Sequence, residues 1–462
     1  MKFKRAALLM AISGMITGGT ASAGDHFVSD AVFQPENGQQ VVPASAYEAS
    51  GVGSEIAQIG CFDESDCDSA CESTSCDGGC DSLCSDGGCD GACGAGCDEG
   101  SCLFDCSLDD PFTLFGEVNG FSIGGWTQLG YHNNANILFN SRPGEYQLHQ
   151  MWLYAEKALD TSDGFDWGAR IDYIYGTDGP DTQAFGVGND HWDAGWTQGV
   201  NGDSDYGHAI PQLYGEVGYG DVSVKFGHFY TIIGWEVVGA PDNFFYSHAY
   251  TMYNSEPFTH TGTLATATLS DELEVYGGYV LGWDSGFEDN GDAFLGGASV
   301  TVCDDINVIY ATVIGRFADS PTGTSEQGYM HSIVTDVALT DQLQYIGQSD
   351  FLKTETAAGV TVRDTLGFNN YLIYTVSDCI AFGTRFEWWH VDGESVGLGL
   401  AGDDADVYAL TTGVNFKPHA NVLVRPEIRW DWVSDADMLP IDILEDGDDS
   451  QTTFGIDTIF LF

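Results

Sequence analysis

Positive charge is scarce in this sequence. Lys and Arg together number 14 among 462 residues, whereas Asp and Glu number 70, and the formal net charge is −56. Three of the bases, Lys2, Lys4 and Arg5, fall within the first five positions, and a chain trimmed there keeps a net charge of −59. Because phosphate binding requires a basic surface, this composition excludes nucleic acid as a partner. It also argues against a basic patch that docks on anionic lipid.

Long apolar runs are missing too. Beyond the N-terminus, no stretch approaches the roughly 20 apolar residues that a membrane-spanning helix requires. Instead, 60 Gly, 27 Phe, 21 Tyr and 11 Trp give a composition that disfavours helices and favours strands. The apolar share of 43% is ordinary for a folded protein. Any membrane span of this chain is therefore expected to consist of strands.

The sequence also lacks the H-E-x-x-H motif of zinc proteases, the Walker phosphate-binding motif and the EF-hand calcium spacing. We predict no metal, no other cofactor and no catalytic residue. Glu387 and Glu427 could form the carboxylate pair of a glycosidase, but the sequence gives no distance between them. A secreted β-rich hydrolase, which predicts a soluble product, stays as the less favoured alternative.

The first feature that is present is an export signal at residues 1–23. Lys2, Lys4 and Arg5 form its charged region, 6–20 its apolar to small-residue region, and Ala-Ser-Ala at 21–23 its cleavage pattern. We expect cleavage near Ala23 and a mature chain that begins at Gly24. No Cys follows directly, which argues against a lipoprotein anchor.

A cysteine-rich acidic segment follows at 61–110, after a polar stretch at 24–60 that is typical of a flexible linker. The segment holds 11 of the 13 cysteines and no Lys or Arg. In an exported protein, disulfides are favoured over metal binding, and the C-x-x-C spacing of zinc sites never occurs. The odd count leaves at least one thiol for an intermolecular bond, unless Cys303 or Cys379 pairs with it. The candidate cross-linking residues are Cys61, Cys67, Cys71, Cys76, Cys80, Cys84, Cys89, Cys93, Cys97, Cys102 and Cys106.

The rest of the chain, 111–462, alternates between apolar and polar residues. Along 421–432, Val422, Ile428 and Trp430 share one parity, while Arg425 and Glu427 share the other. Because successive strand residues face opposite sides, one face is aromatic and the other charged. We predict 16 strands, beginning near 121, 146, 165, 210, 222, 259, 272, 293, 306, 329, 342, 363, 379, 405, 420 and 452.

The connections between these strands decide the architecture. Tight polar turns, such as those at 220–221 and 377–378, alternate strictly with longer loops. Short turns at one end, long loops at the other and an even strand count are typical of an outer-membrane barrel. Both ends of the barrel then lie on the short-turn, periplasmic side. The long loops are 134–145, 177–209, 231–258, 284–292, 317–328, 353–362, 392–404 and 434–451.

The last ten residues support the same architecture. Their outward parity is apolar, and an alternating strand that ends the chain on an aromatic residue resembles the signal read by the barrel-assembly machinery. Lipid of the outer membrane and that machinery are therefore predicted partners. The residues of this assembly signal are Phe454, Ile456, Phe460 and Phe462, with Thr458 on the same face.

Four ordered blocks carry a family resemblance. They are Gly227-His-Phe-Tyr-Thr-Ile-Ile-Gly-Trp-Glu236, Ala240-Pro-Asp-Asn-Phe-Phe-Tyr-Ser247, Pro257-Phe-Thr-His-Thr-Gly262 and Gly282-Trp-Asp284. Over roughly 111–462 the chain resembles the putative β-barrel porin-2 (OmpL-like) family. The resemblance implies an outer-membrane porin, and it assigns no role to the cysteine-rich segment.

An open pore requires polar groups that face inward, and the parity assigns them. Charges of both signs on one face could set a transverse field, as in a porin constriction. The alternative is that these groups only neutralise one another in a plugged lumen. A barrel of about 16 strands is wide enough for an aqueous channel. The predicted pore-lining residues are Arg170, Asp172, Glu216, Lys225, Arg363, Arg385, Glu387, Lys417, Arg425, Glu427 and Arg429.

The function we predict is passive diffusion of small hydrophilic solutes or ions, with a preference for cations. The acids of loop 434–451 should concentrate cations, although general acidic solubility explains them equally well. Loops 177–209 and 231–258, rich in aromatics, fold into the lumen or pack as a rim or subunit contact. An envelope anchor cross-linked through the cysteine-rich segment is the alternative function. A homo-oligomer is expected by fold analogy alone.

Overall fold

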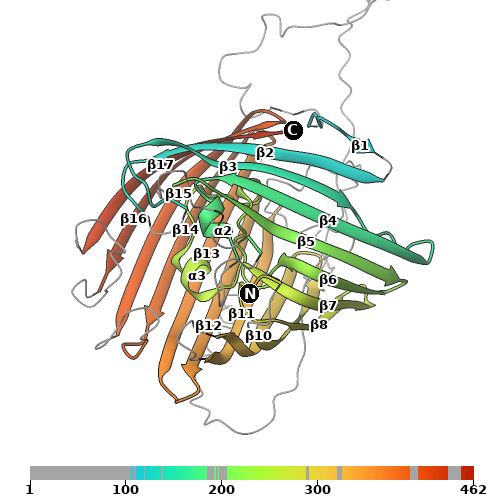
Figure 1. Ribbon diagram of the computed structural model, residues 1–462. Helices are drawn as coiled ribbons and strands as arrows, with labels where there is room; N and C mark the ends of the chain where they lie inside the picture. Colours follow the sequence, from blue (N-terminus) through green and yellow to red (C-terminus); the bar gives the residue numbers. More distant parts are fainter. Residues whose placement is uncertain are drawn as a thin grey trace, which may run out of the picture. The chain divides into compact units, whose positions relative to one another are not determined.

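A computed structural model describes residues 106, 108, 111–118, 120–136, 139–184, 192–193, 196, 205–287, 291–319, 325–395, 404–434 and 449–462. Sixteen long antiparallel strands, β2–β17, form one closed barrel (Figure 1). The barrel closes where the last strand pairs with the first long one, from Gly455 opposite His132 to Leu461 opposite Trp126. The predicted all-β antiparallel barrel of 16 strands is confirmed.

The predicted strand starts lie within four residues of the observed ones. A two-residue strand, β1, was not predicted, and it pairs with the beginning of β2. The strands are β1 (Glu117–Val118), β2 (Phe121–His132), β3 (Tyr146–Lys157), β4 (Phe165–Gly176), β5 (Gly207–Tyr219), β6 (Val222–Tyr230), β7 (Thr259–Ser270), β8 (Leu273–Val280), β9 (Asp292–Cys303), β10 (Ile306–Asp319), β11 (Ser325–Thr340), β12 (Leu343–Thr356), β13 (Thr361–Ser377), β14 (Ile380–Val391), β15 (Ala405–His419), β16 (Val422–Val433) and β17 (Ser450–Leu461).

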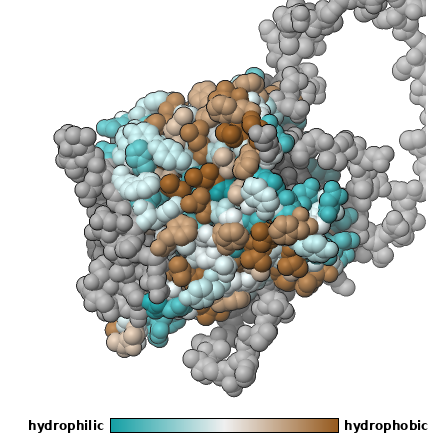
Figure 2. All heavy atoms as spheres, turned by 45° about the vertical axis from the view of Figure 1, so that its right-hand side comes forward, coloured by the Kyte–Doolittle hydropathy of each residue, from teal (hydrophilic) through white to brown (hydrophobic). Residues whose placement is uncertain are grey.

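The two faces of the strands differ as their parity predicts. On β16, Ile428 and Trp430 are 40% and 38% exposed, whereas Arg425, Glu427 and Arg429 are at most 4% exposed. The apolar face is therefore the outer one, the reverse of a soluble barrel and the arrangement of transmembrane barrels. Figure 2 shows apolar side chains over much of one such side of the barrel.

Within the described connections there are three short helical segments. They are α2 (Gly179–Thr182) after β4, and a 3₁₀ turn, η1 (Ala240–Asp242), and α3 (Tyr250–Ser255) between β6 and β7. No helix among the described residues is long and apolar enough to cross a membrane.

A disulfide between Cys106 and Cys379 ties the segment before β2 to the short turn between β13 and β14. The backbone N–H of Phe112 donates to Asn421 Oδ1 at 2.7 Å, and Asn421 Nδ2 donates to the Phe112 carbonyl at 2.6 Å. Cys106 and residues 111–118 thus lie along the short-turn rim, with contacts to the β13–β14 turn, to Asn421 and to β2. Cys303, on another short turn, is also disulfide-bonded. Cys61 through Cys102 lie outside the described residues.

Candidate functional site: the loop inside the barrel

The connection between β6 and β7, residues 231–258, lies inside the barrel and is hereafter the inner loop. Figure 1 shows its helix α3 within the ring of strands, and its residues bond with inward-facing side chains of β12, β13, β14 and β16. Of the two placements that the sequence left open for this loop, the structure has the inward one. The loop therefore decides how much of the lumen stays open.

Three wall arginines hold the inner loop through its carbonyl groups. Arg385 donates to the carbonyl of Ser247 at 2.7 Å and to the Glu236 carboxylate at 2.5 Å. The other two divide their donors between a loop carbonyl and a wall carboxylate, a geometry suited to the planar guanidinium. Arg425 donates to the carbonyls of Ala240 and Asn243 at 2.8 and 2.6 Å and binds Asp457, and Arg429 donates to the carbonyl of His248 at 2.5 Å and to Asp431 at 2.7 Å.

Two wall glutamates hold the same loop through its backbone N–H groups. Glu427 accepts from the N–H groups of Tyr246 and Ser247, at 2.9 and 3.2 Å. Glu387 accepts from the N–H groups of Tyr250 and Thr251 at 2.8 and 2.7 Å, where α3 begins. Hydrogen bonds with a charged partner are the stronger kind, so these contacts fix the loop's course.

Each wall arginine is paired with a carboxylate, Arg385 with Glu236, Arg425 with Asp457 and Arg429 with Asp431. Burial alone would raise the pKa of Glu236, but the Arg385 guanidinium and His248 outweigh it and hold the pKa below its ordinary value. The wall arginines are at most 2% exposed. A buried charge is tolerated only when it is paired and hydrogen-bonded, and here each guanidinium has a carboxylate and a loop oxygen.

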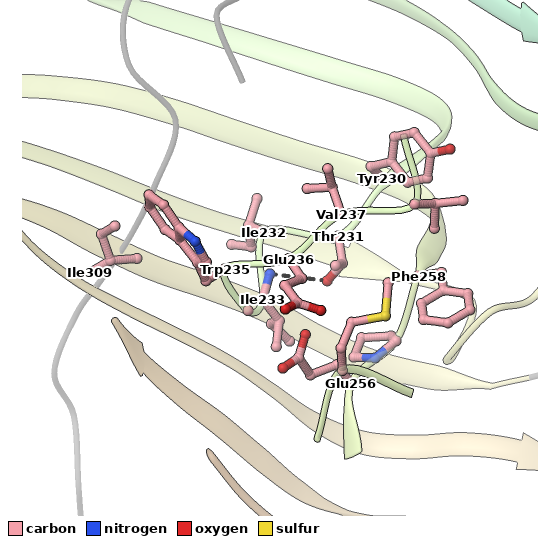
Figure 3. Close-up of a pocket in the computed structure, with 14 residues that line it drawn as sticks. Tyr230, Thr231, Ile232, Ile233, Trp235, Glu236, Val237, Glu256, Phe258 and Ile309 are labelled. Carbon is pink, nitrogen blue, oxygen red and sulfur yellow. Dashed lines mark hydrogen bonds between the residues drawn. The ribbon is translucent and has the colours of Figure 1, made fainter. Parts of the chain in front are cut away.

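The opposite side of the inner loop is apolar. Ile233, Trp235 and Phe244 belong to one buried cluster with inward-facing residues of β7 to β13, such as Leu295 and Ile346. Figure 3 shows Trp235 and Ile232 near Ile309 at a cavity of about 60 Å³, with the carboxylates of Glu236 and Glu256 beside it. One face of the loop is thus held by charge and the other by hydrophobic packing.

A larger cavity of about 400 Å³ lies at the short-turn end, beside β3 to β8. Arg170 is bonded there to Glu156 at 3.0 Å and to Asp172 at 2.6 Å. Five acids and three bases line it, so its wall is net acidic. The charged lining residues are Glu156, Asp160, Glu216, Asp221, Glu274, Lys157, Arg170 and Lys225.

Nine of the eleven predicted pore-lining residues fall into two groups. Arg170, Glu216 and Lys225 line the 400 Å³ cavity, with Asp172 buried behind Arg170. Five others, Arg385, Glu387, Arg425, Glu427 and Arg429, face inward but lie beneath the inner loop instead of lining open water. Their part in permeation stays a prediction.

The last two predicted pore residues lie elsewhere. Arg363 is bonded to Glu326 at 2.8 Å and stacks over the Trp283 ring at 4.5 Å. Lys417 lines a small cavity at the short-turn end with Phe244 and Asn415. Of the acids in loop 434–451, only Asp449 is among the described residues.

The assembly-signal residues are placed as their parity predicts. Phe454 and Phe460 face outward on β17 and are 44% and 43% exposed. Ile456 shares that face, and the backbone of Phe462 exchanges two hydrogen bonds with Gly125 at 2.9 Å. Whether the assembly machinery reads them stays a prediction.

Sequence reasoning missed a buried hydrogen-bond chain at the tip of the inner loop. Tyr246 Oη lies 2.6 Å from His149 Nε2 and 3.2 Å from His132 Nδ1. His149 Nδ1 in turn lies 2.9 Å from Asp178. The aromatic block around 244–247 was a signal that this segment packs against something. Its partners on β2 and β3 are distant in sequence, so periodicity could not identify them.

The sequence contains a G-x-S-x-G pattern at 393–397, and its Ser395 lies beyond the end of β14. Ser395 Oγ accepts from the N–H of Asp364 at 2.9 Å and donates to its carbonyl at 3.3 Å. No histidine base contacts it among the described residues, whereas a nucleophile elbow places its serine on a strand-to-helix turn. Nor does any group of three or more His, Cys, Asp or Glu in the described part of the chain have metal-binding geometry.

The comparisons agree on the fold. The family model described as "Putative beta-barrel porin-2, OmpL-like" matches residues 120–462. An anion-selective porin from Comamonas acidovorans superposes with a TM-score of 0.51 at 10% identity, covering 74% of this chain and 99% of that one. A trimer form of OmpT, an outer membrane protein of Vibrio cholerae, gives 0.49 at 12%, covering 74% and 100%. No curated protein matches the chain in sequence.

Proposed function

Because the chain belongs to the putative β-barrel porin-2, OmpL-like family, we propose that it is an outer-membrane channel for passive diffusion of small hydrophilic solutes and ions, with a preference for cations. The signal at 1–23 would deliver it to the envelope. Neither covalent chemistry nor a cofactor is part of this function. Glu387 and Glu427, the glycosidase candidates, both accept hydrogen bonds from loop N–H groups.

The observation that supports cation preference is the unequal accessibility of the inner charges. Arg385, Arg425 and Arg429 are buried beneath the inner loop. The 400 Å³ cavity, by contrast, has five acids against three bases. The charge that a passing ion meets there is therefore net negative, and such a wall concentrates cations, most strongly at low salt.

The test is single-channel recording in planar bilayers with a salt gradient. We expect stepwise ohmic channels whose reversal potential shows cation preference, and a shift toward zero in Glu216→Gln. Glu355→Gln, an exposed carboxylate on β12, is the matched control. Anion preference in the native protein would refute the selectivity, and insertion without conductance would refute the channel.

A separate proposal concerns disulfide cross-linking through the cysteine-rich segment. The disulfide described, Cys106–Cys379, lies within one chain, so it attaches the segment to its own barrel and gives no support to a tether between proteins. Cross-linking of envelope partners through the other cysteines, like a homo-oligomer, stays a prediction, to be tested by electrophoresis with and without reductant.

A further inference from the structure

Two buried carboxyl groups meet at the end of the inner loop. Gln348 Nε2, on β12, donates to Glu256 Oε1 at 2.6 Å and to Asp350 Oδ2 at 2.5 Å. Glu256 is 4% exposed and Asp350 is fully buried. Both acids are therefore held on a single amide group, away from bulk water.

Both acids of this pair accept from the same side-chain amide, whereas Glu387 and Glu427 accept from backbone N–H groups of the inner loop. Among the described residues, neither carboxyl group of the pair has a Lys or Arg partner, and Oδ1 of Asp350 has no donor. The other ionisable group that faces Glu256 is Glu236, whose charge is satisfied by Arg385 on β14 and by His248. The neighbour of Asp350 on β11 is Ser332, which is uncharged.

Two adjacent carboxylates in a buried site cannot both carry a charge at low cost. One retained proton removes the repulsion and also supplies the donor of a short hydrogen bond between the acids. Deprotonation leaves two negative charges that must share the hydrogens of one amide. In contrast, Glu387 and Glu427 each accept from two backbone N–H groups of the inner loop.

The Glu256–Asp350 pair lies where the inner loop contacts β12, so its protonation can affect how the loop is held. Gln348 Oε1 accepts from the backbone N–H of Trp235 at 3.1 Å, so one residue of β12 holds both the beginning and the end of the inner loop. Figure 3 shows Trp235 and Glu256 around the same small cavity. We propose that the Glu256–Asp350 pair is a proton-dependent latch that holds the inner loop on β12 and releases it as the pH rises.

The direction of the effect follows from linkage. Burial and the adjacent Asp350 raise the pKa of Glu256 well above its ordinary value. An acid with a raised pKa favours the docked state fully below its ordinary pKa, and this contribution is lost as the pH rises through the raised value. The latch is therefore closed in acid and opens in alkali.

Hydrogen exchange of the inner loop tests the latch without any measurement of conductance. Protein in detergent micelles is compared with Glu256→Gln at pH 6 and at pH 9.5, because comparison at one pH cancels the chemical exchange rate. Glutamine imitates the protonated acid. We expect at least tenfold faster exchange in the native loop than in the variant at pH 9.5, and a smaller difference between the two at pH 6.

Two further variants keep this test decisive. Asp350→Asn removes the same repulsion from the other side of the pair, so it should also abolish the faster exchange of the inner loop at pH 9.5. This variant provides the test if Glu256→Gln fails to fold. Glu355→Gln, exposed on the same strand, should behave as the native protein. Equal exchange of native protein and both pair variants at pH 9.5 would overturn the proposal.

The effect on permeation rests on the proposed channel. Native conductance should rise, or become noisier, between pH 6 and 9.5, while Glu256→Gln stays flat. Absence of channels at every pH would refute the proposed function, yet the exchange experiment would still decide whether the latch exists.

Discussion

Replacing Arg385 with Met should loosen the inner loop and destabilise the barrel. The guanidinium donates to Glu236, to the Ser247 carbonyl and hydroxyl, and to Thr411, at distances of 2.5 to 3.2 Å. Its removal leaves the Glu236 carboxylate buried without its cation. Breaking a buried pair by removing one partner costs about 3–5 kcal/mol. Tyr371 and the N–H of Ala249 still donate to Glu236, so we expect about 3 kcal/mol.

A second substitution, at Glu236, tests whether the loss comes from the unpaired carboxylate. In the double variant Arg385→Met, Glu236→Gln, no charge is left buried, so at least half of the lost free energy of unfolding should return. Arg385 and His248 hold the pKa of Glu236 below its ordinary value, so the stability that this acid contributes is present at neutral pH and lost only in strong acid. Without Arg385, burial dominates, and the single variant should gain stability as the pH falls toward 4.

Reversible urea unfolding in lipid vesicles measures both effects, and single-channel recording reports loop mobility as increased current noise. A loss below about 1 kcal/mol, or a double variant no more stable than the single one, would refute the reasoning, because both results mean that the pair is not buried and coupled as the geometry shows.

Two further predictions concern the frame around the loop. Cys106→Ser should lower the free energy of unfolding by about 5 kcal/mol on the chain-entropy account, because the disulfide joins residues 273 positions apart. Reductant should destabilise the native protein more than the variant, in which the Cys106–Cys379 bond is already absent and the disulfide of Cys303 is still present to be reduced. Gly383→Val should displace the tip of the inner loop, since a Cβ there would lie 2.2 Å from the Phe244 ring. We expect the free energy of unfolding to fall by about 1–3 kcal/mol and the conductance to increase. Thr384→Val, on the outward face of the same strand, is the control.

The barrel itself could be predicted because its signal is local. A period of two along each strand separates outward Trp430 from inward Arg429, and short turns alternate with long loops along the chain. Strand β1 could not be predicted, because two residues are too few to show an alternation of apolar and polar side chains. The inward-facing residues of the strands were also predictable. Their contacts were not, because partners such as Arg385 and Glu236 lie 149 positions apart in the sequence.

One signal in the sequence could have located the inner loop. Several inward positions are glycines that approach loop side chains: Gly383 at Phe244, Gly455 at Tyr246 and Gly367 at Thr251. A glycine among large inward residues indicates that something packs closely there. The sequence does not show which loop packs against these glycines. On composition alone, the aromatic loop 177–209 was an equal candidate.

The inner loop is held unequally along its length, and this limits how it can move. Its middle, from Ala240 to Thr251, is fixed by charge-assisted bonds to three arginines and two glutamates of the wall. Its two ends meet β12 through one amide, Gln348. Any reversible motion should therefore begin at Trp235 and Glu256 and leave the arginine contacts intact. Alkaline release in the native protein should then leave exchange of the 240–251 amides slow, whereas Arg385→Met should accelerate it at every pH.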